Sequence, residues 1–235
     1  MNSQKHDFTP LEKLIGISFS NRQLLENVFV HRSFLNENKN YHLSSNEKLE
    51  FLGDSVLSLI TSIYLFKHYH ELSEGDYTDI KASIVRTESL AEAAAEIGLG
   101  SYLLLSKGEE KGNGRRNSNI LADTFEALVA CIFIEHGFEQ AYNFVRSHLF
   151  KEKLDTIVKN KLYMSPKSRL QEIVQARHKI LPTYKVTEET GPEHSKTFTV
   201  SVYIADSLVG TGTGTSKKMA EEAAAKKALE KELNF

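Results

Sequence analysis

Two pairs of carboxylates interrupt stretches of the chain that are otherwise strongly apolar. Glu50 and Asp54 stand four residues apart, and Asp123 and Glu126 stand three residues apart, so each pair shares one face of a helix. Aspartate is a poor helix former, so Asp54 and Asp123 oppose the local propensity of their surroundings. The chain must therefore fold so that two apolar helices can bury their surfaces while both carry acidic side chains.

The sequence also marks the ends of these two helices. Ser44 followed by Glu47 has the form of a capping box, and the helix that it starts is predicted to run to about His68. The second helix is predicted over residues 118–136. Glu47 adds a third carboxylate three residues before Glu50, and two interpretations of it stay open: a member of an acidic site, or a partner in the helix cap.

Packing of the two helices through their apolar faces would bring four carboxylates together. So dense a negative charge is tolerable only around a cation or with raised pKa values. Oxygen ligands favour a hard ion, Mg²⁺ with Mn²⁺ as a possible substitute, and the predicted ligands are Glu50, Asp54, Asp123 and Glu126. A lone carboxylate usually belongs to a solvated helix face, but two matched pairs inside apolar helices favour a metal site.

The length of 235 residues and a change in the spacing of apolar residues along the chain predict two domains. Apolar residues recur at helical spacing up to about residue 150, which predicts an all-helical domain over residues 1–150. A lysine-rich stretch then leads to Ser165-Pro166, a pair that commonly starts a helix. We therefore expect a linker over residues 151–164 and a second domain over residues 165–235.

The second domain is predicted to be a small α+β unit of order α-β-β-β-α. One helical stretch, residues 167–178, precedes three segments of alternating character, of which residues 197–204 are the clearest strand. Phe198 and its alternate neighbours form the face predicted to be buried, and the other face is predicted to be wet. The last helix is alanine-rich and is predicted to begin with Ser216 as its N-cap.

The charge is unevenly divided between the two parts. Residues 163–235 hold 11 basic and 9 acidic side chains, whereas residues 1–162 hold 18 basic and 22 acidic ones. Lys217 and Lys218 fall in the first turn of the last helix, where the helix dipole disfavours cations. Free backbone N–H groups and two ammonium groups at that position are suited to a phosphate, although ordinary surface lysines are an equal alternative on charge alone.

Other features restrict the location and the ligands. Residues 1–20 lack the apolar core of a signal peptide, and we expect no bilayer-spanning segment, no membrane partner and a cytoplasmic location. Cys131 is the only cysteine, which excludes an intrachain disulfide and a cysteine-rich zinc site, and its apolar neighbours predict a buried thiol. The polar stretch 107–119 matches no nucleotide-binding phosphate loop, and we expect no small-molecule cofactor. Its Arg115 and Arg116 could reach RNA phosphates, or the stretch could be a solvated connection between helices.

The acidic motifs resemble those of a known family. Asn46-Glu-Lys-Leu-Glu-Phe-Leu-Gly-Asp-Ser-Val-Leu is similar to the signature helix of bacterial ribonuclease III, and Leu121-Ala-Asp-Thr-Phe-Glu-Ala-Leu is similar to its second acidic motif. The resemblance implies that Asp54 and Glu126 are catalytic, and that Glu47 lies near a dimer interface and the RNA. It also implies a homodimer that cuts double-stranded RNA to leave 5'-phosphate and 3'-hydroxyl ends, and that processes rRNA, tRNA and mRNA precursors.

The second domain resembles a double-stranded RNA-binding domain. The resemblance rests on the α-β-β-β-α order, on the loop Gly191-Pro-Glu-His194 and on Thr215-Ser-Lys-Lys-Met-Ala-Glu-Glu-Ala-Ala. Such modules recognise the shape of A-form RNA. The resemblance implies that the minor grooves and phosphates of the RNA are contacted by Gln171, Glu172, His194, Lys217 and Lys218.

Two competing functions fit the sequence less well. A catalytically silent scaffold that only binds duplex RNA is disfavoured because all four metal-binding carboxylates are present. A helical phosphohydrolase that acts on small nucleotides is disfavoured because its substrate would gain nothing from an RNA-binding module.

Overall fold

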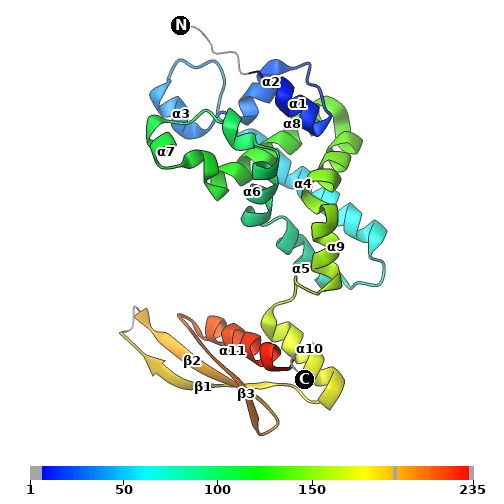
Figure 1. Ribbon diagram of the computed structural model, residues 1–235, viewed down its shortest axis with the longest axis vertical. Helices are drawn as coiled ribbons and strands as arrows, with labels where there is room; N and C mark the ends of the chain where they lie inside the picture. Colours follow the sequence, from blue (N-terminus) through cyan, green and yellow to red (C-terminus); the bar gives the residue numbers. More distant parts are fainter. Residues whose placement is uncertain (1–6, 193–194, 233–235) are drawn as a thin grey trace. The chain divides into compact units, whose positions relative to one another are not determined.

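Helices α4 and α8 form the centre of the first of two structural units. The computed structural model describes residues 7–192 and 195–232, and it divides into the units Met1–Lys159 and Asn160–Phe235. In the first unit, α4 (Glu47–His68) packs against α8 (Ser118–Val145), as Figure 1 shows in cyan and green. The α8 helix is interrupted at Gly137, whose φ of 78° lies outside the helical region, so its regular part ends where the sequence predicts.

A glycine sets the distance between these two helices. A Cβ atom added to Gly53 would lie 1.9 Å from the carbonyl oxygen of Glu126, closer than any side chain could be accommodated. The backbone of α4 therefore touches the backbone of α8 at the turn that carries Glu126. The contact lies between the two acidic pairs and brings their side chains within reach of one another.

Shorter helices complete the first unit. Helix α6 packs on α8, and α5 packs on both α4 and α6. The remaining elements of this unit, with their bounds, are α1 Thr9–Ile15, α2 Arg22–Val28, α3 Arg32–Glu37, α5 Glu74–Ile84, α6 Thr87–Glu96, α7 Lys107–Lys111, α9 Lys151–Lys159, the 3-10 turns η1 Leu99–Tyr102 and η2 Gly114–Arg116, and the π-helical turn η3 Arg146–Phe150.

The stretch expected to be a linker begins with a helix. Helix α9 packs against α5 and η3, and its Leu154 and Ile157 are buried, so the first unit extends to Lys159. Two apolar side chains, Leu154 and Ile157, lie at helical spacing among the lysines of this stretch. The burial of these two side chains makes α9 part of the first unit.

Helix α4 is also long and apolar enough to cross a bilayer, although no bilayer-spanning segment is expected from the sequence. Its most apolar window reaches a mean hydropathy of 1.4, and it is the one helix of residues 7–192 and 195–232 that meets this test. Leu57, Ile60 and Leu65 are fully buried, and the helix packs along α8. These contacts are those of the core helix of a folded domain.

The second unit confirms the predicted α-β-β-β-α order. Helix α11 (Lys217–Glu232) lies on a three-stranded antiparallel sheet of order β1-β2-β3, and helix α10 (Pro166–His178) packs against α11. The strands are β1 Thr183–Thr190, β2 Thr197–Ile204 and β3 Ser207–Gly214. Leu170, Val174 and Val202 form the core with alanines of α11.

One detail of strand β2 differs from the prediction of a wet face. Ser201 is buried, and its Oγ lies 3.1 Å from the Oγ1 of Thr211 on the neighbouring strand. A central strand has partners on both sides, so a small polar side chain in its middle is covered by its cross-strand neighbours.

We predict that Gly53→Ala lowers the free energy of unfolding by about 2–3 kcal/mol, because the added methyl group must push the two helix backbones apart. Thermal unfolding and RNA cleavage measure the two consequences, and both should deteriorate. Gly75→Ala in helix α5 is the matched control, since its nearest neighbour would be the Ser73 Oγ at an ordinary 3.7 Å. Equal stability of the two variants would contradict the importance of this contact.

Candidate metal centre and its cleft

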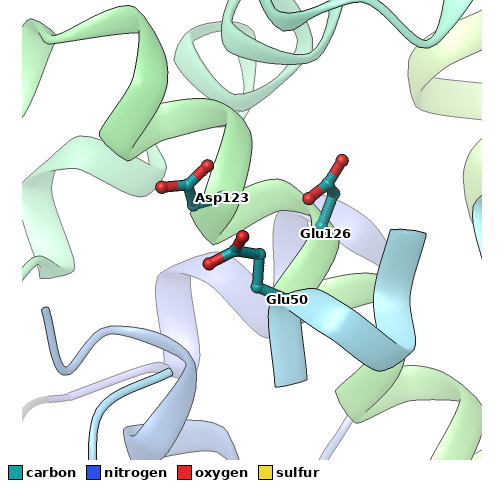
Figure 2. A group of neighbouring side chains, drawn as sticks. All are labelled: Glu50, Asp123 and Glu126. Carbon is teal, nitrogen blue, oxygen red and sulfur yellow. The ribbon is translucent and has the colours of Figure 1, made fainter. Parts of the chain in front are cut away.

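Three of the four predicted carboxylates come together between α4 and α8. Glu50 projects from α4, and Asp123 and Glu126 project from α8 (Figure 2). One carboxylate oxygen from each lies within 4.8 Å of the other two, and all three side chains are half-buried. The spacing is that of groups that could share one ion.

Asp54 lies beside this group without belonging to it. Its side chain is exposed, one helical turn beyond Glu50. Its charge nevertheless acts on the cluster, because among the neighbouring charges Asp54 is the strongest in raising the pKa of Glu126. The structure thus places Asp54 at the margin of the site, on the side of Glu126.

The cluster holds more negative charge than its setting favours. Burial, followed by repulsion from Asp54, Asp123 and Glu50, raises the pKa of Glu126 to about 8. Burial is also the main cause that raises the pKa values of Glu50 and Asp123. At neutral pH the cluster therefore keeps a proton that a divalent cation would displace, and an all-oxygen donor set fits a hard ion.

Glu47 does not cap helix α4, so the first of its two interpretations, a member of the acidic site, remains. The predicted capping box with Ser44 does not form, because α4 begins at Glu47 with Asn46 as its N-cap and without a side-chain cap bond. Asn46 is buried, and it donates its backbone N–H to the carbonyl of Val30 and its side-chain amide to the carbonyl of Val28. These long-range bonds fix the start of the helix.

The Glu47 carboxylate instead faces a cleft. It accepts a hydrogen bond of 2.6 Å from the Ser45 hydroxyl and lies 3.8 Å from the Arg32 guanidinium. The cleft has a volume of about 640 Å³, and Glu47 shares its lining with Glu50 and Asp123. This volume provides space for a ligand next to the acidic cluster.

Sequence reasoning missed several side chains of this cleft. Among them are His31, Arg32 and Glu109. His31 is half-buried, and burial is the main cause that lowers its pKa. The signal available in the sequence was a cluster of polar residues, His31-Arg-Ser33, directly after the apolar residues Val28 to Val30.

The polar stretch 107–119 is mostly structured. It forms α7 and η2, and Arg115 donates to the carboxylate of Glu110 and to the carbonyls of Gly100 and Ser101. Arg115 therefore stabilises the connection between helices, which favours the interpretation of this stretch as a solvated connection.

Cys131 is fully buried, and burial raises the pKa of its thiol to about 12, which makes it an inert core residue.

The predicted RNA-contact residues of the second unit are exposed where they are described. Gln171 and Glu172 lie on α10, and Glu172 forms an ion pair with Lys161. Lys217 and Lys218 are exposed in the first turn of α11, where the Ser216 hydroxyl accepts the N–H of Met219 as the predicted N-cap. Lys217 also places its ammonium 5.7 Å from the ring centroid of Phe198. His194 lies outside the described residues.

An acidic centre on two packed helices, followed by a separate α-β-β-β-α unit, defines a metal-dependent nuclease with an RNA-binding module. The family described as Ribonuclease-III-like matches residues 21–153, and the Double-stranded RNA binding motif matches residues 166–232. The chain therefore belongs to the ribonuclease III family, whose members are endoribonucleases that act on double-stranded RNA.

Individual relatives agree with this assignment over most of their length. Ribonuclease 3 of Caldanaerobacter subterraneus is 46% identical over 223 residues, which cover 95% of this chain and 97% of the relative. Ribonuclease 3 of Chloroflexus aurantiacus is 44% identical over 221 residues, which cover 93% and 89%. The solved nuclease domain of ribonuclease III from Campylobacter jejuni is 33% identical, with a TM-score of 0.57, and the match covers 61% of this chain and 96% of that domain.

Proposed function

We propose that this chain cuts both strands of duplex RNA with Mg²⁺ held by Glu50, Asp123 and Glu126, with Mn²⁺ as a substitute. The observation that carries the proposal is the convergence of these carboxylates within 4.8 Å, with a raised pKa at each of them. Asp54 completes the site from its exposed position beside Glu126. The products are 5'-phosphate and 3'-hydroxyl ends.

Each acidic residue has a separate task in this proposal. A bound divalent ion supplies Lewis acidity and an activated water to an in-line attack on phosphorus. Glu50 and Asp123 hold their oxygens on the cleft side of the cluster, where RNA enters. Glu126 would hold the ion with its half-buried carboxylate, which would then be ionised. Asp54 is exposed to solvent, and the role that we assign to it is to orient a water molecule and accept its proton.

Glu126→Gln should reduce the single-turnover cleavage rate of long duplex RNA about a thousandfold or more, because the amide removes one anionic ligand at the centre of the cluster. Binding of the same RNA in EDTA should stay within about twofold of wild type. The matched control is Glu88→Gln, an identical chemical change at a side chain that is 67% exposed on α6. Mg²⁺-dependent cutting that survives Glu126→Gln would refute the proposed site.

The second unit is proposed to hold the duplex by its A-form shape. Lys217 and Lys218 would contact phosphates at the N-terminus of α11, where unpaired backbone N–H groups also favour an anion. Gln171 and Glu172 would reach one minor groove from α10, and His194 would reach the next. The exposure of both lysines and of the two α10 residues supports this arrangement.

Replacement of Lys217 and Lys218 by alanine should weaken the binding of duplex RNA and reduce the slope of log affinity against log salt by about 1–2, because phosphate contacts release counterions. Filter binding at several salt concentrations measures this slope. The control removes two exposed lysines of the first unit, Lys13 and Lys39, and should leave the slope unchanged. An unchanged slope in the first variant would exclude its two lysines from the interface.

We also propose that the protein is a homodimer. The strands of an RNA duplex are related by local two-fold axes, so a two-fold dimer would present one acidic site to each strand. Phe51 follows Glu50 on α4 and is 79% exposed, whereas Leu57, Ile60 and Leu65 of the same helix are fully buried. The description of the solved Campylobacter jejuni nuclease domain names structural flexibility in a region involved in dimer formation. An aromatic side chain so exposed is suited to a second copy of the chain.

Phe51→Glu should convert a dimer into a species with the monomer mass of 26.5 kDa in sedimentation velocity, because a charge replaces an apolar contact at the interface. Leu208→Glu is the control, since Leu208 is 55% exposed on strand β3 of the other unit. A wild-type protein that sediments as a monomer at all concentrations would refute the dimer.

The location and the biological substrates complete the proposal. We place the enzyme in the cytoplasm, where it would process precursors of rRNA, tRNA and mRNA. The separate RNA-binding unit supports long, structured RNA as substrate, because a small nucleotide would not need it.

A further inference from the structure

One part of the cleft wall has no role in the chemistry proposed above. It is the turn from His31 to Ser33, at the start of α3. Its backbone is held firmly, because His31 donates its N–H to the carbonyl of Leu104, and the preceding Val30 forms a bridge with the same residue. The side chain of His31 therefore projects from a fixed point beside the acidic cluster.

Hydrogen bonds on one side of the ring determine which nitrogen carries its proton. The Nδ1 of His31 accepts the backbone N–H of Ser33 at 3.3 Å and lies 2.8 Å from the Ser33 Oγ. That oxygen also accepts the backbone N–H of Ser106 at 3.1 Å, and its own hydrogen can point to Nδ1. Nδ1 is thus an acceptor, and the ring proton belongs on Nε2.

The other ring nitrogen of His31, Nε2, makes no such bond within the part of the chain that the structure describes. It has no hydrogen bond to any residue within 7–192 or 195–232, and His31 lines the same cleft as Glu50 and Asp123. Glu47 and Glu109 make the lining still more acidic. A phosphodiester entering this space is repelled by four carboxylates, so donors on the wall are needed to hold it in place.

We propose that His31 donates a hydrogen bond from Nε2 to a non-bridging phosphate oxygen of the RNA strand that occupies the cleft. Ser33 is the positioning residue, because its hydroxyl and backbone N–H keep the ring in the required tautomer. The contact adds to the affinity for the RNA strand at the point of cleavage and aligns the scissile group with the acidic cluster. The inference rests on the proposed cleavage at that cluster.

Two substitutions separate the donor from the rest of the side chain. In His31→Asn the amide oxygen can still accept the N–H of Ser33, as asparagine does at many helix N-caps, but nothing reaches the position of Nε2. In His31→Gln the longer side chain returns an amide N–H to that position. We expect the single-turnover rate at saturating Mg²⁺ to fall about 10- to 100-fold in His31→Asn and to return to within about threefold in His31→Gln. Equal rates in His31→Asn and wild type would overturn the proposal.

His31 could also act on the charge of the neighbouring Asp123, and thereby on metal binding, instead of on the RNA. A metal titration distinguishes these two effects. If His31 acts on the RNA, the Mg²⁺ concentration for half-maximal cleavage stays unchanged in His31→Asn and the deficit persists at saturation. Recovery of the wild-type rate by excess Mg²⁺ would instead show that His31 supports a metal ligand, and it would overturn the contact with phosphate. A wild-type chain that does not cut duplex RNA refutes the proposed function itself, which is a separate outcome.

The tautomer can be observed without metal or RNA. A long-range ¹H–¹⁵N spectrum of the histidine rings should show the His31 proton on Nε2 in the wild-type chain. Ser33→Ala should give a mixture of tautomers with slower cleavage, and Ser33→Thr, which keeps the hydroxyl, should behave as wild type. A proton on Nδ1 in the wild-type chain would contradict the arrangement.

Discussion

The close packing of α4 against α8 determines the geometry of the acidic cluster in the first unit. The missing side chain of Gly53 lets one helix backbone touch the other at Glu126, and the acidic residues on both helices then share a small, half-buried volume. Carboxylates placed so closely destabilise the fold unless their charge is offset. The chain keeps a proton on Glu126, whose pKa is raised to about 8, until a cation takes its place. In the proposed function, this repulsion is relieved when a divalent ion binds to the cluster.

The two units solve different electrostatic problems. The first must bring RNA to an acidic centre, and its cleft has donors such as Arg32 and His31 among the carboxylates. The second has a small net charge, and it gathers two exposed lysines, Lys217 and Lys218, at one helix end. Its α11 lies close against the sheet because Gly210 and Gly212 on β3 face the alanine-rich side of the helix. Local clustering of charge, rather than the total, makes the chain suited to nucleic acid.

Patterns within single elements could be predicted from the sequence. The acidic helices, the strand from Thr197 to Ile204 and the Ser216 cap depend on neighbours a few residues away, so spacing alone was sufficient. Features that depend on distant contacts could not be predicted. The start of α4 is set by bonds from Asn46 to Val28 and Val30, and the His31 network depends on Leu104 and Ser106, far along the chain.

The most direct test of the account is anomalous diffraction from crystals soaked in Mn²⁺. We predict one strong peak between α4 and α8, with oxygens of Glu50, Asp123 and Glu126 at about 2.1 Å from the ion. A Glu126→Gln crystal under the same conditions should lose most of this peak. The absence of a peak at the cluster in the wild-type crystal, with Mn²⁺ bound elsewhere or not at all, would contradict the central claim.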